Sequence, residues 1–277
     1  DLTPAYPFEG FGVRLAGKGS SYWFNINELW TSMTFDDCKT GIYANSYALN
    51  VEKTTMTNVD VGIDIANSRK RDIILDQNTI TARKFGIRSG LNEPLHFSSV
   101  IRNNTVTITG LGTGNNPVTG IQMNEIGLGY TPKPGQTAPQ IFGTDGWEVS
   151  GNSVTMTLGG NGILYRNGFS GLLESNMVND VGATTNSGLY DGIRVDASTF
   201  SQINFNDVTR STSAGGNATS RAINSSAGFA NAFTCNCVDN TGVGLQFSDM
   251  ADFTNNVKGN KLNDHDDTGI QVGAENI

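Results

Sequence analysis

One short pattern of apolar and polar positions recurs along the whole chain. It is a glycine, a large aliphatic residue, a residue that is usually polar, and then an apolar or small residue, as in Gly192-Ile193-Arg194-Val195. One copy has alanine in place of the glycine. The copies begin at Gly12, Gly41, Gly62, Gly86, Gly120, Gly162, Gly192, Ala222, Gly244 and Gly269. Ten copies in 277 residues indicate an internal repeat.

A second pattern alternates with the first: an asparagine, any residue, and then an aliphatic residue. It begins at Asn27, Asn78, Asn104, Asn152, Asn176, Asn206, Asn236 and Asn260. A short apolar run, such as Ile73-Ile74-Leu75, precedes the asparagine. Each repeat therefore predicts three short strands, because apolar and β-branched runs bounded by Gly and Asn indicate strands and turns.

Three strands per repeat predict an all-β fold, a single-stranded right-handed parallel β-helix of about ten coils with three short strands per coil. Coils stack at about 4.8 Å, so the rod is about 45 Å long. We expect an irregular lead-in over residues 1–11 and the β-helix over 12–277. The chain opens on Asp1, and no amphipathic helix caps the last strand at Gln271-Val272. Both observations favour a segment of a longer chain.

The repeated residues have expected roles in such a coil. The aliphatic residues after the glycines are expected to stack inside it as a ladder: Ile42, Ile63, Ile87, Ile121, Ile163, Ile193, Ile223, Leu245 and Ile270. Each glycine suits a bend with positive φ or a close approach of backbone. Each repeated asparagine suits a left-handed turn whose amide bonds to the next coil, which forms an asparagine ladder.

One interval departs from the repeat. Gly120 and Asn152 are 32 residues apart, which predicts a protruding loop near residues 124–145. Long loops often carry function. The Gly-rich stretch at 110–117 lacks the Gly-Lys-Ser/Thr of a phosphate loop, so we do not expect phosphate binding there.

Composition excludes several classes of partner. The formal charge of −8 argues against nucleic acid or an anionic membrane as partner. No apolar run reaches the ~18 residues of a membrane span, so no membrane insertion is expected. The three cysteines have neither disulfide nor metal spacing and are interpreted as small buried residues. The sequence predicts no metal site and no cofactor.

The polar residues between the inward aliphatics define the surface available to a ligand. Five of them form a candidate polar strip near the protruding loop: Arg88, Gln122, Arg166, Arg194 and Asp196. The alternative is that this strip is only the solvated outer face that any such sheet needs.

Catalytic signals are sparse. A glycosidase needs two carboxylates, one with a raised pKa, and Asp180, Asp191 and Asp196 lie close in sequence without forming an aligned pair. A lyase needs carboxylates for Ca²⁺ and a basic residue, which Arg194 and Asp196 allow. Neither His96 nor His265 accompanies a nucleophile in a motif. We therefore assign no catalytic residue, and enzymatic activity stays open.

Two other surfaces have alternative interpretations. Thr-x-Thr positions recur at Thr79/Thr81, Thr105/Thr107/Thr109 and Ser153/Thr155/Thr157, and flat threonine arrays occur in ice-binding β-helices. Threonine also simply favours exposed strands. The basic turn at residues 68–71 could contact an acidic glycan or could be balanced by Asp72 and Asp76.

The Gly-Ile and Asn-x-Val repeats resemble the right-handed parallel β-helix of the pectate-lyase-like superfamily over nearly the whole chain. Residues 233–272, from Phe233-Thr234-Cys235-Asn236-Cys237-Val238 through Gly269-Ile270-Gln271-Val272, resemble coils of large secreted surface proteins of Bacteroidota exported by a type IX system. The Gly-His-Gly, Asn-Thr-Asp, Asp-Asp, Arg-Ile-Lys and Trp-Ile-Asp-His signatures of pectate lyases and polygalacturonases are missing from the sequence. The resemblance thus implies an extracellular protein and assigns no catalytic residue.

These observations favour an extracellular structural or adhesive β-helix module of a large cell-surface or filament protein. Its expected partners are a glycan or another cell-surface ligand, and copies of the chain assembled as a homo-oligomer or end to end. The alternative is a polysaccharide-degrading lyase or hydrolase, or a glycan depolymerase like a phage spike, that acts on the polar strip.

Overall fold

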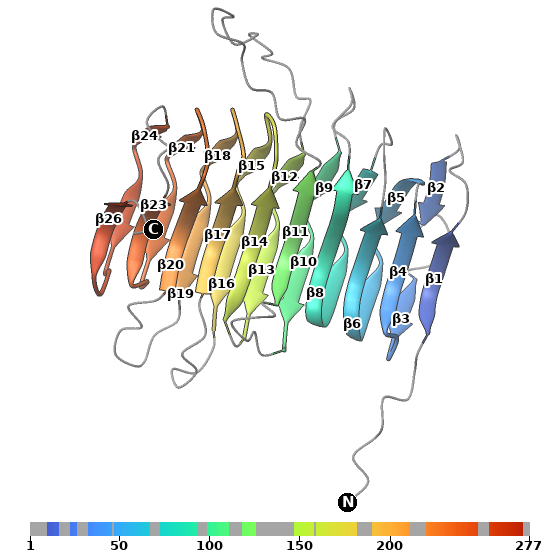
Figure 1. Ribbon diagram of the computed structural model, residues 1–277. Coiled ribbons are helices and arrows are strands. Elements are labelled where there is room, and N and C mark those ends of the chain that lie inside the picture. Colours follow the sequence, from blue (N-terminus) through green and yellow to red (C-terminus); the bar gives the residue numbers. More distant parts are fainter. Residues whose placement is uncertain are drawn as a thin grey trace, which may run out of the picture.

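The computed structural model describes residues 10–16, 23–26, 33–45, 47–66, 73–92, 99–110, 118–125, 147–157, 159–181, 190–210, 220–248 and 255–273. Within these residues the regular elements are all strands, and they pair in parallel with the equivalent strands of neighbouring coils. The coils stack side by side into a rod, with the N-terminal end blue and the C-terminal end red (Figure 1). The predicted fold class, an all-β parallel β-helix with three strands per coil, is confirmed.

Three faces make up the wall of the rod. Face 1 contains the Gly-Ile repeats in ten strands, β1 (Phe11–Ala16), β4 (Thr40–Asn45), the second halves of β6 (Thr55–Ala66) and β8 (Thr79–Asn92), β11 (Thr119–Glu125), β14 (Gly160–Arg166), β17 (Tyr190–Asp196), β20 (Ser220–Ser226), β23 (Val243–Ser248) and β26 (Thr268–Gly273). The ten strands of face 1 match the ten copies of the repeat.

Faces 2 and 3 complete each coil with shorter strands. Face 2 is formed by β2 (Trp23–Ile26), β5 (Ala48–Glu52), β7 (Ile73–Asp76), β9 (Val100–Arg102), β12 (Glu148–Ser150), β15 (Leu172–Glu174), β18 (Gln202–Asn204), β21 (Ala232–Thr234) and β24 (Asn256–Lys258). Face 3 is formed by β3 (Thr34–Asp36), the first halves of β6 and β8, β10 (Thr105–Ile108), β13 (Ser153–Met156), β16 (Met177–Asp180), β19 (Asp207–Arg210), β22 (Cys237–Asp239) and β25 (Lys261–Asn263).

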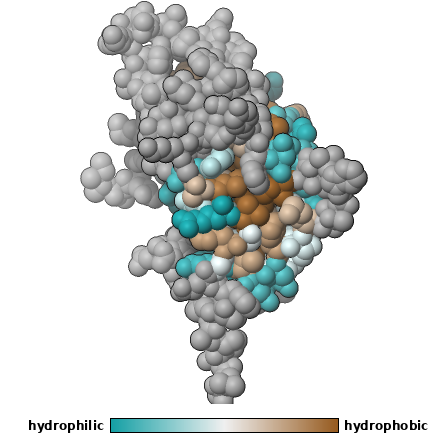
Figure 2. All heavy atoms as spheres, turned by 90° about the vertical axis from the view of Figure 1, so that its right-hand side faces the viewer, coloured by the Kyte–Doolittle hydropathy of each residue, from teal (hydrophilic) through white to brown (hydrophobic). Residues whose placement is uncertain are grey.

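The predicted aliphatic ladder fills the coil. Ile163 and Ile193 are adjacent rungs of face 1 and are both fully buried. They pack in one hydrophobic core with Leu173 of face 2 and Val178 of face 3. In the view onto the β1 end of the rod, apolar atoms occupy the centre and hydrophilic atoms surround them (Figure 2). Each fully buried aliphatic side chain contributes about 2 kcal/mol to folding, so the ladder is a main source of stability. The last rung, Ile270, is 48% exposed.

The repeated glycines are needed for close packing between coils. A Cβ at Gly162 would lie 2.2 Å from Cγ1 of Val178 and 2.5 Å from the carbonyl oxygen of Gly192. The same conflict occurs at Gly62, Gly86 and Gly120, and none of these glycines has a positive φ. The close-approach interpretation is therefore correct, and the expectation of positive φ is wrong at these positions because they lie within continuous strands.

The asparagine ladder exists, but its left-handed residue is not the asparagine. Asn152 donates from Nδ2 to Oδ1 of Asn176 at 2.9 Å and to the carbonyl oxygen of Ile101 at 2.9 Å. The same chain of bonds continues through Asn206, Asn236 and Asn260. Positive φ occurs one residue earlier, at Gln77, Asn103, Gly151, Ser175, Phe205, Cys235 and Gly259. This preceding residue makes the turn, and the asparagine then points its amide into the coil.

Candidate functional site

The candidate site lies on the outer side of face 1, on β14, β17, β20 and β23. Strand register brings Leu164, Arg194, Asn224 and Gln246 into one row across these strands. A second row joins Arg166, Asp196 and Ser226. These rows follow from the repeat itself, because residues at equal offsets from the Gly-Ile pair become lateral neighbours in a parallel sheet.

A third row adds Asp191 to this surface. Tyr190 and Ile193 are both fully buried although they lie three residues apart, so the strand's alternation is interrupted around Gly192. Asp191 therefore shares the outer side with Arg194 and pairs in register with Arg221 of β20. We refer to Arg166, Asp191, Arg194, Asp196 and Arg221 as the face-1 ion cluster.

One half of the face-1 ion cluster surrounds Asp196. Its Oδ1 accepts from Nε of Arg194 at 2.9 Å and from the hydroxyl of Ser226 at 2.7 Å. Its Oδ2 accepts from Nε of Arg166 at 3.1 Å. Burial acts to raise the pKa of Asp196, but the hydrogen bonds from these three residues outweigh it and lower the pKa from the ordinary value. Asp196 is thus held as a carboxylate.

The other half surrounds Asp191, which is 2% exposed. Its Oδ1 accepts from Nε of Arg221 at 2.5 Å and its Oδ2 accepts from Nη2 of Arg221 at 3.0 Å. Nη1 of Arg194 lies 3.6 Å from Oδ2, so one guanidinium lies between the two carboxylates. Burial raises the pKa of Asp191, and the nearby charges of Arg221 and Arg194 offset only part of that rise. The two carboxyl groups of the cluster are therefore shifted in opposite directions.

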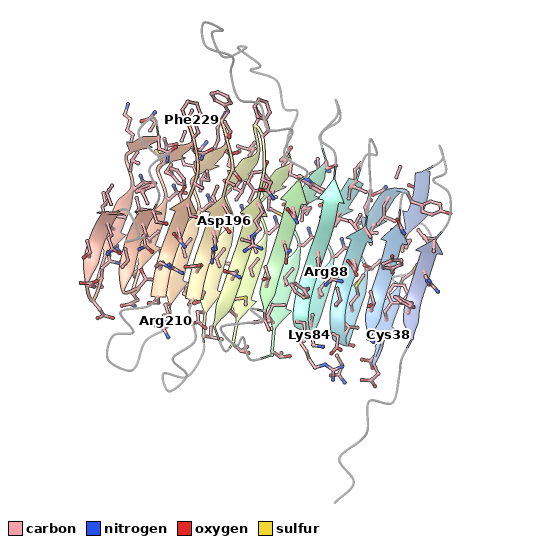
Figure 3. All side chains as sticks on the ribbon, in the orientation of Figure 1. Cys38, Lys84, Arg88, Asp196, Arg210 and Phe229 are labelled. Atoms are coloured by element: carbon pink, nitrogen blue, oxygen red, sulfur yellow. The ribbon has the colours of Figure 1, made fainter. Side chains whose placement is uncertain are left out.

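The structure divides the predicted polar strip. It brings Arg166, Arg194 and Asp196 together, whereas Arg88 forms a separate pair with Asp64 at 2.5 Å. Arg88 also lies over the ring of Phe85 at 4.9 Å. Gln122 pairs in register with Arg88 on one side and with Leu164 on the other, and Leu164 is buried. Figure 3 shows Arg88 and Asp196 on the same face, several strands apart.

Arg221 escaped prediction although it binds Asp191 most closely. It stands in the one repeat that has alanine for glycine, and it precedes the aliphatic residue, whereas the expected outward positions follow that residue. The signal that identifies it is its offset, because Asp191 and Arg221 each stand directly before the first residue of a repeat.

A second ion pair lies inside the corner beneath this cluster. Asp180 and Arg210 are register partners on face 3 and pair at 3.2 Å. They continue an inward row that Ile108 and Met156 occupy on the two coils before Asp180. The nearby hydroxyl of Tyr190 donates to the carbonyl oxygen of Thr209 at 3.4 Å. Burial raises the pKa of Tyr190 well above its ordinary value, and the charge of Asp180 adds to the effect. Tyr190 is thus a neutral donor that links β17, the strand carrying Asp191, to β19, the strand carrying Arg210.

Three phenylalanines line the corner that follows the Arg166–Asp196–Ser226 row. The ring centroids of Phe169 and Phe200 are 5.6 Å apart, and those of Phe200 and Phe229 are 5.9 Å apart. Both pairs are edge-to-face, at 83°. Phe229 is 38% exposed and lies at the upper edge of the rod in Figure 3, above Asp196.

His265, the threonine rows and the cysteines, which the sequence also singles out, lie away from the face-1 ion cluster. Nδ1 of His265 lies 3.1 Å from the hydroxyl of Thr241, which ties the acidic turn to the preceding coil. The predicted threonine rows are in register on face 3, where Thr79, Thr105 and Ser153 are neighbours, and Met177 ends the series. Of the three free cysteines, Cys235 is exposed and the other two are half-buried, so fully buried cysteines were a wrong expectation.

Some predictions fall outside the described residues. These include His96, the basic turn at 68–71 and the protruding loop, except that β11 extends through Glu125. Within the part of the chain that the structure describes, no group of three or more His, Cys, Asp or Glu side chains is arranged to hold a metal ion. The same residues contain no helix of the length and apolarity needed to cross a bilayer.

No protein family model matches the sequence, and no curated protein matches it. Among solved structures, the chain is similar to the A-module of the mannuronan C-5 epimerase AlgE4 of Azotobacter vinelandii, with 12% identity over 87% of this chain and 74% of that one and a TM-score of 0.33.

The Dettilon tailspike protein (gp208) is a second similar structure, with 12% identity over 91% of this chain, a TM-score of 0.34 and 61% of the tailspike chain covered. The chain thus spans about three fifths of the tailspike's length. At this identity the likeness concerns the fold alone, and the strand pairings described above establish that fold independently.

Proposed function

We propose that this chain is an extracellular glycan-binding β-helix module whose binding surface is the face-1 ion cluster. The observation that carries the proposal is the setting of Arg166. Its Nε is fixed by Asp196 at 3.1 Å, its side chain is 41% exposed, and its two terminal nitrogens have no hydrogen-bond partner among the described residues. An anchored guanidinium with free N–H groups is a preorganised donor for sugar hydroxyls and carboxylates.

The local charge favours an acidic glycan. Three guanidinium groups, those of Arg166, Arg194 and Arg221, face two carboxylates, those of Asp191 and Asp196. This surface therefore carries an excess of one positive charge on a chain whose formal charge is −8. Planar guanidinium groups bind carboxylates through two parallel N–H bonds, so a uronate unit is the expected ligand group.

Binding fits the geometry better than catalysis. Both carboxylates are engaged by guanidinium groups, and Asp191 is almost fully buried behind Arg194 and Arg221. A general acid or base must reach the reacting oxygen within hydrogen-bond distance. A substrate would have to displace an arginine before it reached Asp191, whereas it can reach Arg166 directly.

Titration calorimetry with an oligogalacturonate hexamer and with cellohexaose tests this proposal. We expect the acidic hexamer to bind more tightly, and Arg166→Gln to weaken its binding about tenfold while leaving any binding of cellohexaose unchanged. The matched control is Arg102→Gln, because Arg102 forms an equivalent exposed pair with Asp76 at 3.0 Å on face 2. Equal binding by wild type and Arg166→Gln would contradict the proposal.

One observation favours cleavage of the glycan as a second candidate function. The environments of Asp191 and Asp196 shift their pKa values apart, which is the arrangement that a pair of acid and base carboxyl groups requires. In this case Asp191 would supply the proton and Asp196 would remain ionised. Release of shorter oligosaccharides by wild type and its loss in Asp191→Asn, with hexamer binding retained, is the expected result of that alternative.

The resemblance of residues 233–272 to coils of large secreted surface proteins of Bacteroidota supports an extracellular, adhesive role. We extend the proposal to a type IX exported parent protein that displays this module on the cell surface. Surface labelling of intact cells with an antibody against the module tests this placement. Homo-oligomers or end-to-end assembly stay predictions, which light scattering of the purified chain tests.

A further inference from the structure

The aromatic corner beside the face-1 ion cluster carries three apolar rings in edge-to-face contact, in an otherwise polar region. Phe169, Phe200 and Phe229 come from three successive coils, and none of them belongs to the hydrophobic core cluster. The ring of Phe200 contacts the rings of both Phe169 and Phe229, and Phe229 lies at the upper edge of the rod in Figure 3. We name these three residues the phenylalanine corner.

The backbone of the corner fixes these rings outward. Tyr165 is fully buried at this corner, and a Cβ at Gly168 would lie 1.9 Å from Cζ of Tyr165, so the ring of Tyr165 fills the interior next to the backbone of Gly168. Corresponding residues of the three bends have the same left-handed backbone, with φ of 53° at Ser170, 55° at Phe200 and 53° at Ala230. The bend is therefore repeated by the coil geometry, with Phe169 and Phe229 directly before its left-handed residue and Phe200 at that residue, so all three rings stand on a preorganised backbone.

Hydrogen bonds between coils make the corner rigid. The amide of Gly168 donates to Oγ of Ser198 at 3.2 Å, and the amide of Gly171 donates to Oγ of Ser201 at 3.3 Å. The amide of Ser201 in turn donates to Oδ1 of Asn231 at 2.9 Å. A ring on such a corner loses little conformational freedom on binding, which favours its use as a contact surface.

The phenylalanine corner is continuous with the ion cluster. Phe169 follows Arg166 by three residues, and Phe200 follows Asp196 by four. Oγ of Ser198, between Asp196 and Phe200, donates to the carbonyl oxygen of Asp196 at 3.0 Å, which keeps the chain turned sharply from the polar row to the aromatic one. Charged donors and flat apolar rings thus occur side by side on three neighbouring coils.

We propose that the phenylalanine corner is a further subsite that stacks against the C–H faces of the pyranose rings of a glycan chain lying along the rod axis, with the sugar carboxylates on the ion cluster. This inference rests on the proposed function and adds its apolar half. One side of a pyranose ring presents C–H groups, which pack on the electron-rich face of an aromatic ring. Coils repeat at about 4.8 Å, close to the length of one sugar unit in an extended glycan.

Phe200→Leu and Phe229→Leu test the subsite, because leucine keeps the apolar volume and removes the flat ring. The matched control is Phe205→Leu. Phe205 is 57% exposed and has φ of 54°, like Phe200, but it lies at the corner between faces 2 and 3. We expect Phe200→Leu and Phe229→Leu each to weaken binding of the oligogalacturonate hexamer about fivefold, with Phe205→Leu and all melting temperatures unchanged.

Saturation-transfer NMR gives the second readout. Irradiation of the aromatic protons should transfer magnetisation to the ring C–H protons of the hexamer, and the transfer should fall in Phe200→Leu. Wild-type affinity in both corner variants, together with lost binding in Arg166→Gln, would overturn the subsite and leave the proposed function standing. Lost binding in the corner variants with full binding in Arg166→Gln would support the subsite and overturn the ion cluster as the binding surface. No binding by wild type to either hexasaccharide would overturn both.

Discussion

Asp191 and Arg221 form the closest charged contact of the candidate site, with 2.5 Å between Oδ1 and Nε, although 30 residues separate them in sequence. The contact joins β17 to β20 at equivalent positions of two coils. Asp191 is buried and Arg221 is half-buried, and both lie on the outer side of face 1, so the pair ties these two neighbouring coils together.

Arg221→Gln should destabilise the protein by about 3 kcal/mol, because it leaves the buried carboxylate of Asp191 with only two longer contacts, to Nη1 of Arg194 at 3.6 Å and to Nδ2 of Asn224 at 3.4 Å. Asp191→Asn should cost less, because the guanidinium left behind can reach water and still bonds to Gln246 at 3.0 Å. Urea unfolding at neutral pH measures both values. A smaller loss in Arg221→Gln than in Asp191→Asn would contradict this account of the pair.

The two carboxylates should shape acid stability in opposite ways. The pKa of Asp191 is raised by burial, so its contribution to stability is full below the unfolded pKa, near 3.8, and is lost as pH rises through the folded pKa. The pKa of Asp196 is lowered: burial opposes the shift, and the hydrogen bonds from Arg194, Ser226 and Arg166 outweigh it. Its contribution is present above the unfolded pKa and is lost as pH falls through the folded pKa.

Asp191→Asn should therefore steepen the rise in the free energy of unfolding between about pH 3 and pH 6, and Asp196→Asn should flatten it. The measurement is urea unfolding of both variants and wild type across this range. Parallel curves for all three proteins would show that neither carboxyl group has a shifted pKa.

Much of the fold could be predicted because the repeat acts locally. Ile193 is inward for the same reason as Ile163, namely its place after a glycine in a strand. The role of the glycine was harder to predict from the sequence, because a Cβ at Gly162 would clash with Val178 and Gly192, which lie far from it in sequence. The sequence also does not show that the residue before each asparagine has the positive φ, since Gly151, Ser175 and Phe205 share no side-chain chemistry.

The site was harder to predict because it depends on lateral register. Arg166 and Asp196 meet because they are register partners on β14 and β17. The turns between strands vary in length, so the number of residues between two positions does not reveal this register. The phenylalanine corner was missed for a related reason. Phe169 and Phe229 occupy one backbone position, but Phe200 stands one residue later than its bridging neighbour Thr199 and reaches the row through its side chain.

Asn152→Ala should cost about 3 kcal/mol. The side chain donates to Ile101 and Asn176 and accepts from the backbone amide and Nδ2 of Asn104, and it is almost fully buried. Its removal leaves buried donors and an acceptor without partners. Asn260→Ala, near the end of the ladder and half-buried, should cost about 1 kcal/mol. Urea unfolding measures the difference, and equal costs would show that the ladder adds no stability through burial.

Ile193→Asp should abolish cooperative folding of several coils, because it places an unpaired carboxylate in the hydrophobic core. Circular dichroism during thermal melting detects the loss. Gln202→Asp is the control, since Gln202 is an exposed outward residue of β18 and should melt like wild type. An unchanged melting curve for Ile193→Asp would refute the inward position of the ladder.

Gly162→Ala should destabilise the protein by about 3 kcal/mol, because the added methyl group would lie 2.2 Å from Val178 and 2.5 Å from the carbonyl oxygen of Gly192. Relief requires the two coils to separate, which lengthens the hydrogen bonds between β14 and β17. Gly269→Ala is the matched control at the same repeat position. Its nearest neighbour would be Cδ1 of Leu262 at 3.5 Å, an ordinary contact, so its stability should stay within about 0.5 kcal/mol of wild type. Urea unfolding of both variants measures the difference. A Gly162→Ala variant as stable as wild type would contradict the account that close approach between coils requires glycine at this position.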